Sequence, residues 1–309
     1  MRKIVGYLRA HLEEDFDARL YLKQALFLAA LISINYTIEL EDKIIDAYVG
    51  KPIRTLWYFL LYGTGYYGSL LIWATHTRQL TLFRNPQVWV YSLFILVVLA
   101  WDGSFYAYQS WSKQIFDGQI YWFAFYSLAN LSSVLTTFLP LILFYRLIDH
   151  QRTRFYGLWQ PQNVNPYLLL LLAMLPLIIW ASFQPDFLRS YPTYRDSRVD
   201  EFFGVSPRVT AILYELFYGF DFISTELLFR GFMIIGMVHL LGRGALLPMV
   251  VCYATLHFGK PLGETIGSIF GGYILGVIAL QTRSIWGGIL VHVGVAWAME
   301  MAAWLQTTR

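Results

Sequence analysis

The chain has 309 residues, of which 57% are hydrophobic and only 14% are charged, and its net charge is +3. A soluble domain carries roughly a quarter charged residues, so too few charges are present here to cover a globule of this size. The small net charge gives no reason to expect a nucleic acid partner. The single cysteine, Cys252, excludes a disulfide within the chain. The composition therefore favours a lipid bilayer as the surrounding solvent.

A series of apolar stretches follows a charged N-terminal segment, residues 1–23. A helix needs about 20 residues to cross a bilayer, so several of these stretches are marginal. One of them, 209–241, is too long for a single straight span and must tilt, break or leave the membrane. The sequence predicts an all-α polytopic transmembrane helical bundle with roughly eight or nine membrane helices. The stretches are 24–40, 56–74, 87–102, 120–145, 166–183, 209–241, 244–258, 262–280 and 284–305.

The N-terminal segment is rich in charge and lacks a short apolar region followed by a small-residue cleavage site. We therefore expect no cleaved signal peptide, and the first membrane helix directs insertion. The basic residues Arg2, Lys3, Arg9 and Arg19 favour an orientation with the N-terminus on the cytoplasmic side.

The membrane segments change in character near Ser206. Before this point they are almost free of ionisable groups, and after it they contain several. Because charge in hydrocarbon is costly, this change indicates a functional region. We predict three parts: a charged N-terminal segment (1–23), N-terminal membrane helices and loops (24–205), and a core that carries the chemistry (206–309). The ionisable residues of this core include Glu215, Asp221, Glu226, Arg230, His239, His257, His292 and Glu300.

Two patterns within this core stand out. Glu226 and Arg230 are four residues apart, so on a helix they share one face. Such a pair is either an intrahelical ion pair that neutralises two costly groups or part of a functional site. His257 ends an apolar run, and a single histidine there is more often a packing residue. A second histidine, His292, on a separate apolar helix is harder to explain by packing.

Glycines recur between the two histidines. Gly263, Gly267 and Gly271 are spaced by four residues, and Gly272 and Gly276 follow. Small residues at this spacing allow close helix approach. The pattern predicts that the histidine-bearing helices pack closely against a neighbour.

These residue types are suited to the activation of water. A carboxylate can take a proton from water, a histidine can relay it, and a further polar group can stabilise an oxyanion. The chain contains neither the H-E-x-x-H zinc motif nor the G-x-S-x-G nucleophile elbow. We expect no cofactor, although two histidines and one glutamate could also ligate a divalent metal. The pattern favours peptide hydrolysis in a membrane-embedded cavity.

The order of these motifs resembles the CAAX protease and bacteriocin-processing (CPBP, or Abi) family, which includes the type II CAAX prenyl endopeptidases. The order is E-x-x-x-R, then an aromatic residue four positions before a histidine, then a second histidine on the last apolar helix. The resemblance covers about Val209 to Trp304. Leu-Leu-Phe-Arg-Gly-Phe after the glutamate and Thr-Arg-Ser-Ile-Trp-Gly-Gly before the last histidine support it.

The resemblance implies glutamate-dependent intramembrane proteolysis. Family members typically carry two adjacent glutamates, of which the first activates water, and an Asn or Asp four residues after the last histidine. Here Thr225 stands in the place of the first glutamate and Ala296 in the place of the Asn or Asp. The resemblance implies catalytic roles for Glu226, Arg230, His257 and His292, and supporting roles for Thr225 and Tyr253.

The two departures leave three interpretations open. Glu226 alone acts as the base, or another carboxylate (Asp221, Glu264 or Glu300) compensates, or the chain is a catalytically inactive family member. An inactive member would bind or scaffold membrane partners in immunity, secretion or envelope maintenance. A transporter is a weaker alternative, because the ionisable groups have no paired half in the chain. The expected partners are membrane lipid and a hydrophobic or lipid-anchored peptide, and the expected location is the bacterial inner (plasma) membrane.

Overall fold

The computed structural model describes residues 2–194 and 198–307, and every regular element in these ranges is a helix. The predicted all-α class is thereby confirmed. In chain order the elements are α1 (Arg2–Asp15), α2 (Ala18–Ile38), η1 (Leu40–Ile45), η2 (Asp46–Tyr48), α3 (Ile53–His76), η3 (Leu80–Arg84), α4 (Pro86–Ser104), α5 (Ala107–Ile115), α6 (Gly118–Leu131), η4 (Val134–Phe138), α7 (Leu139–Phe144), η5 (Tyr145–Asp149), α8 (Asn165–Ala181), α9 (Pro185–Ser190), α10 (Val199–Phe203), α11 (Pro207–Glu226), η6 (Leu227–Gly236), α12 (Val238–Leu241), η7 (Gly242–Ala245), α13 (Leu246–Thr255), α14 (Leu262–Thr282) and α15 (Trp286–Thr307).

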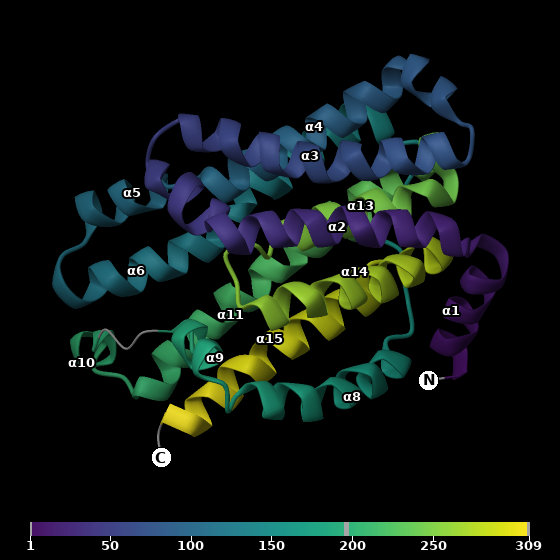
Figure 1. Cartoon of the computed structure of the whole chain (residues 1–309). Helices are drawn as coiled ribbons and strands as arrows, with labels where there is room; N and C mark the ends of the chain where they lie inside the picture. The colour runs from purple at the N-terminus through teal and green to yellow at the C-terminus, as the bar shows by residue number, and fades with distance from the viewer. Residues whose placement is uncertain (1, 195–197, 308–309) are drawn as a thin grey trace.

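The chain is a polytopic membrane protein. Most of the long helices run in roughly the same direction or its reverse, as Figure 1 shows. Two further helices pack beside the candidate spans: the 24-residue helix α3 packs against α4 and α13, and the shorter apolar helix α8 packs against α15. The count of eight or nine membrane helices stays a prediction. Within the described residues, six stretches are long and apolar enough to cross a membrane: Ala18–Ile38, Pro86–Ile115, Gly118–Asp149, Pro207–Thr255, Leu262–Thr282 and Trp286–Thr307.

The long stretch predicted at 209–241 breaks rather than running straight. Helix α11 passes at Leu227 into the π-helical turns of η6, and the chain bends again at Met237. Gly242 then adopts a positive φ of 55°, which glycine tolerates because it has no Cβ. After this turn α13 packs against η6. The break therefore brings the segment that carries the Glu/Arg pair beside the helix that leads to His257.

One hydrophobic core joins the N-terminal helices to the C-terminal ones. Tyr62 and Leu70 of α3 belong to the same buried cluster as Met249 and Tyr253 of α13. Helix α3 packs against both α4 and α13. The N-terminal helices therefore support the region in which the candidate residues lie, while the division at residues 205 and 206 stays a prediction.

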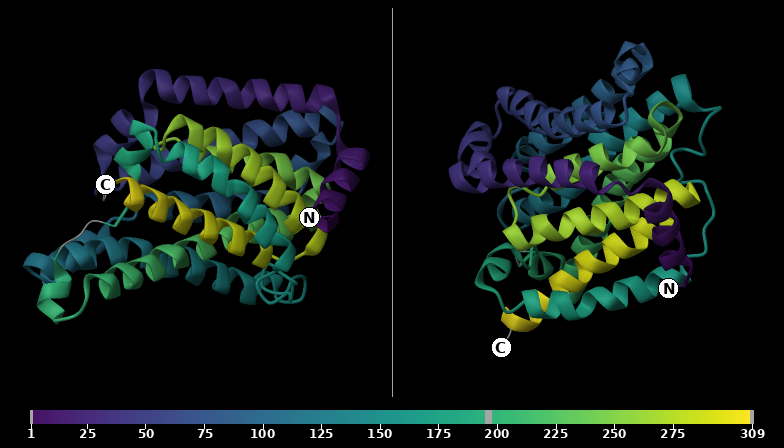
Figure 2. Two further views of the ribbon diagram at one scale, coloured as in Figure 1. Left: turned by 90° about the horizontal axis from the view of Figure 1, so that it is seen from below. Right: turned by 45° about the vertical axis from the view of Figure 1, so that its right-hand side comes forward.

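Helix α1 lies across one end of the bundle, and the two chain termini lie at opposite ends (Figure 2). Ile4 is 2% exposed and packs in a small cluster with Tyr167, Leu275 and Val291. Helix α1 therefore docks onto helices that come much later in the chain.

The predicted role of the glycine series is wrong for its first three members. A Cβ added at Gly263, Gly267 or Gly271 would meet no atom within 4 Å. Close approach occurs at Gly272, which lies against Tyr253, and at Gly276. The face of α14 that packs on α13 therefore lies about one residue, or roughly 100°, around the helix from the face that carries Gly263, Gly267 and Gly271.

Candidate functional site

The structure pairs Glu226 with Arg230 in the interior. Glu226 is the last residue of α11 and is fully buried, and Arg230 lies one turn later in η6 with 1% of its surface exposed. Nη1 of Arg230 lies 2.9 Å from Oε1 of Glu226. Leaving either charge alone in the interior would be costly, so the contact offsets the burial of both groups.

His292 joins this pair from α15. Its Nδ1 lies 3.0 Å from the same Oε1 of Glu226. The second carboxylate oxygen, Oε2, makes no hydrogen bond within the described residues. This oxygen faces Gly288, where an added Cβ would overlap with it. The absence of a side chain at Gly288 therefore lets α15 approach the glutamate.

Tyr253 of α13 connects His292 with Arg230. Its hydroxyl lies 3.2 Å from Nε2 of His292. Its ring lies beneath the guanidinium of Arg230, with 4.2 Å between the guanidinium carbon and the ring centroid, a cation–π contact. Since the ionised Glu226 can only accept, Nδ1 of His292 carries a proton, and in the neutral imidazole Nε2 accepts from the tyrosine. Glu226, His292 and Tyr253 thus form one hydrogen-bonded chain.

His257 also contacts Tyr253, and it lies just after the span that ends at Thr255. The two rings meet edge to face with centroids 4.7 Å apart. Nδ1 of His257 lies 2.9 Å from the backbone carbonyl oxygen of Tyr253 and must therefore carry the proton. Burial lowers the pKa of His257 to about 3, so the ring is neutral near pH 7. Its Nε2 then carries a lone pair and makes no hydrogen bond in the described part of the chain.

The loop that carries His257 is held at several points. Thr265 of α14 donates to the His257 carbonyl oxygen at 2.6 Å. Asn35 of α2 donates to the carbonyl oxygen of Phe258 at 3.0 Å. These bonds fix the backbone at His257 and at the residue after it. The position of His257 is therefore set by the fold rather than by a mobile loop end.

Asp221 and Thr225, two of the predicted supporting residues, do not contact Glu226 through their side chains. Asp221 interacts with Asp102 of α4 and with Ser133, not with Glu226. The hydroxyl of Thr225 donates to the carbonyl oxygen of Asp221 at 3.2 Å, within its own helix. Thr225 thus offers no proton acceptor comparable to a carboxylate.

Two other predicted carboxylates bind the segment after α9. Glu264 accepts from the hydroxyl of Tyr191 at 3.0 and 3.1 Å. Glu300, only 5% exposed, accepts from the backbone N–H of Thr193 at 2.8 and 2.9 Å and from its hydroxyl at 2.8 Å. Over residues 2–194 and 198–307, neither carboxylate hydrogen-bonds with Glu226 or with the two histidines. Both therefore serve to hold the segment at 191–193.

The donor set for a metal ion is also not assembled. In the part of the chain that the structure describes, no group of three or more His, Cys, Asp or Glu side chains is placed to hold a metal. Glu226 and His292 lie in contact, whereas within the described residues His257 makes no hydrogen bond or ion pair with either of them.

Two features of the site were not predicted from the sequence. One is the hydrogen bond between Tyr253 and His292, and the other is the contact of Gly288 with Glu226. The second had a signal, because Gly288 and His292 are four residues apart and so share a helix face. The first had none, because the two residues lie on separate helices.

One comparison with known proteins matches the region that contains these residues. Residues 207–298 match the family model described as type II CAAX prenyl endopeptidase Rce1-like. No curated protein matches the chain, and no solved structure does. The matched residues include all five that converge, Glu226, Arg230, Tyr253, His257 and His292, together with the departures at Thr225 and Ala296.

Proposed function

We propose that this chain, which through residues 207–298 belongs to the CAAX protease (CPBP) family, is an intramembrane endopeptidase. It would hydrolyse a peptide bond of a membrane-associated substrate with activated water. The observation that supports this most directly is the placement of a neutral His257 beside the buried chain of Glu226, His292 and Tyr253.

In the proposed reaction, Nε2 of His257 accepts a proton from water. The water oxygen forms a bond to the carbonyl carbon of the peptide, and the carbonyl oxygen takes the electron pair as an oxyanion. When this intermediate collapses, the C–N bond breaks, and the leaving nitrogen takes the proton from His257. The products are a carboxylic acid, which then ionises, and an amine.

Glu226 and Arg230 prepare the site for this chemistry. Ionised Glu226 fixes the proton of His292 on Nδ1, as the short contact at 3.0 Å requires. The guanidinium of Arg230 places a positive charge in a region of low dielectric, where it stabilises developing negative charge more than it would in water. With Thr225 in the place of the family's first glutamate, the transfer of the water proton falls to Nε2 of His257.

The burial of these groups restricts the substrate. Glu226 and Arg230 lie within a candidate span, so the scissile bond must reach the depth of the membrane helices. A hydrophobic peptide or a lipid-anchored one meets this requirement, because its anchor already lies in the bilayer. We therefore propose a substrate of this class, and a location in the bacterial inner membrane.

The two departures favour one other function. Thr225 and Ala296 remove two polar positions of the family pattern. A member that has lost catalysis but kept the arrangement of helices would bind a membrane-anchored peptide without cleaving it. Cleavage distinguishes this binding or scaffold role from the proposed one.

A cleavage assay with matched variants tests the proposal. The purified protein in lipid nanodiscs is incubated with a library of quenched fluorescent peptides, each with a hydrophobic or lipidated end. We expect turnover of some of them, and a loss of about 100-fold or more in Glu226→Gln and His257→Gln. Glu201→Gln, on the exposed surface of α10, is the control and should keep wild-type rates. Cleavage that survives both site variants would contradict the proposal, and binding without cleavage would favour the scaffold role.

A further inference from the structure

A cavity lies at the end of the bundle where α14 ends, away from His257. Its volume is about 520 Å³, within the range of about 300–1,000 Å³ usual for small-ligand sites. The loop after η5, the segment from η6 to α12, and the residue after α14 form its walls. The residues that matter for its chemistry are Arg152, Arg154, Gln160, Ile235, His239 and Arg283.

The charge of this cavity is not compensated. No Asp or Glu side chain contributes to its lining. Within the described residues, the guanidinium groups of Arg154 and Arg283 have neither an ion pair nor a hydrogen bond. Burial lowers the pKa of Arg283, which agrees with a cation that lacks a counterion. The cavity therefore has the electrostatics of an anion site.

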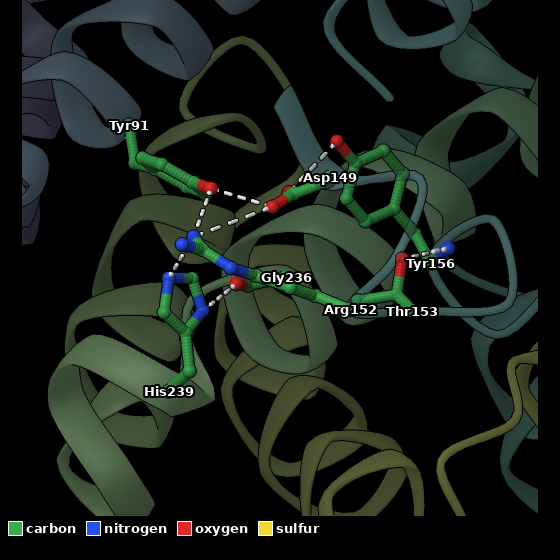
Figure 3. A network of polar contacts seen from close by, with 7 residues as sticks. All are labelled: Tyr91, Asp149, Arg152, Thr153, Tyr156, Gly236 and His239. Atoms are coloured by element: carbon green, nitrogen blue, oxygen red, sulfur yellow. Dashed lines mark hydrogen bonds and ion pairs between the residues drawn. The ribbon is translucent and has the colours of Figure 1, made fainter. Parts of the chain in front are cut away.

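The third arginine, Arg152, is held in place by a polar network, as Figure 3 shows. Its Nη1 lies 3.0 Å from the hydroxyl of Tyr91 and 3.1 Å from Nε2 of His239. The buried carboxylate of Asp149 lies 3.8 Å away and accepts from the hydroxyls of Tyr91 and Tyr156 at 2.5 and 3.1 Å. Asp149 is thus largely satisfied by the tyrosines, so Arg152 is oriented at the cavity without being fully neutralised.

The cavity lies at the depth of lipid headgroups. One candidate span ends at Asp149 and another at Thr282, directly before the arginines. Two exposed tryptophans flank the lining residues, Trp159 with 61% and Trp286 with 40% of its surface exposed. Tryptophan concentrates at the membrane–water interface. A ligand that enters this cavity is therefore within reach of the headgroup layer.

We infer that this cavity binds a phosphate group, as carried by the headgroup of an anionic phospholipid or by free phosphate. Guanidinium groups bind phosphate oxygens through paired, charge-assisted hydrogen bonds, and three arginines converge here. Ile235 and Val238 form an apolar wall that suits the glycerol part of a lipid. Basic cavities between membrane helices recognise acidic headgroups in this way.

The test measures thermal unfolding of the full chain in detergent with three additives: phosphatidylglycerol, phosphatidylcholine and inorganic phosphate. We expect the midpoint to rise with phosphatidylglycerol and not with phosphatidylcholine, and the apparent affinity to fall about 10-fold or more in Arg154→Gln/Arg283→Gln. A rise with inorganic phosphate alone would identify free phosphate as the source.

A matched control separates the cavity from general surface charge. Lys23→Gln/Arg84→Gln removes the same number of positive charges from exposed positions outside the cavity lining. It should respond to phosphatidylglycerol as the wild type does. The inference is overturned if neither phosphate source raises the midpoint, or if the cavity variant and the control respond alike. Neither variant changes a residue of the proposed cleavage site. A cooperative unfolding transition without additives shows that each variant is folded.

Discussion

Glu226 and His292, 66 positions apart in the chain, are joined by a contact of 3.0 Å between Oε1 and Nδ1. The same carboxylate oxygen also lies 2.9 Å from Nη1 of Arg230. One oxygen atom thus links α11, η6 and α15. The geometry of the site depends on the charge of Glu226.

The buried pair of Glu226 and Arg230 should behave as a unit in stability measurements. Removing one partner of such a pair leaves an uncompensated charge and costs about 3–5 kcal/mol. We expect Glu226→Gln and Arg230→Met each to lower the unfolding free energy by that order. The double variant should lose less than the sum of the two. Denaturant unfolding in detergent measures this, and strictly additive losses would show that the two residues are not coupled.

Gly288→Ala should impair catalysis through the position of Glu226. The added Cβ would overlap with Oε2 of Glu226, so the carboxylate must move. A displacement of about 1 Å at a catalytic group costs up to about 100-fold in rate. The matched control is Gly267→Ala, where an added Cβ meets nothing within 4 Å. Cleavage rates of the two variants measure the effect, and equal rates would mean that the close approach of α15 is not needed.

The lowered pKa of His257 predicts how stability depends on pH. In the unfolded chain this histidine titrates near 6.5, and in the folded chain near 3. Below pH 6.5 the unfolded state therefore binds a proton that the folded state does not, so stability falls as the pH drops through 6.5 toward about 3. Unfolding midpoints between pH 7.5 and 5 should decline less steeply in His257→Gln. His150→Gln, on the surface, should keep the wild-type slope, and an unchanged slope in His257→Gln would contradict the assignment.

Tyr253→Phe isolates the hydroxyl that contacts His292. Phenylalanine keeps the ring beneath Arg230 but removes the hydrogen bond of 3.2 Å to Nε2. A neutral hydrogen bond contributes about 1 kcal/mol net, so we expect the cleavage rate to fall about fivefold while the fold is retained. Tyr126→Phe, outside the site, is a suitable control. A wild-type rate in Tyr253→Phe would show that the hydroxyl does not orient His292 during turnover.

Glu300→Gln distinguishes structural support from compensating catalysis. Glu300 accepts from Thr193 through its backbone N–H and its hydroxyl, and a buried hydrogen bond to a charged group is worth about 1.5–3 kcal/mol. We expect a lower unfolding midpoint with nearly normal turnover of the folded protein at low temperature. A normal midpoint with lost turnover would instead restore Glu300 as a catalytic carboxylate.

Local spacing predicted some of these contacts and could not predict others. The four-residue spacing of Glu226 and Arg230 correctly placed both on one face, because helical geometry fixes that relation. For Asp221 the same kind of spacing was insufficient. It lies one turn from Thr225 as expected, yet its side chain faces Asp102 of α4, and the rotation of a helix about its axis depends on its neighbours.

Local spacing could not predict that the two histidines come together, because their relative position also depends on how the helices pack. His257 and His292 both contact the ring of Tyr253 because α13 packs against α14 and because Gly288 lets α15 approach. These are contacts between helices, which no single segment encodes. Similarly, the regular glycine spacing in α14 predicted close packing at Gly267, but the packed face carries Gly272 and Gly276.

The docking of α1 has a consequence for biogenesis. Ile4 is synthesised well before three of the residues that bury it, Leu275, Ile278 and Val291. Arg243, which contacts Asp15 at 2.5 Å, is likewise made late. During synthesis α1 must therefore remain undocked until α14 and α15 have been inserted. Protection of α1 from protease therefore reports that α14 and α15 are in place.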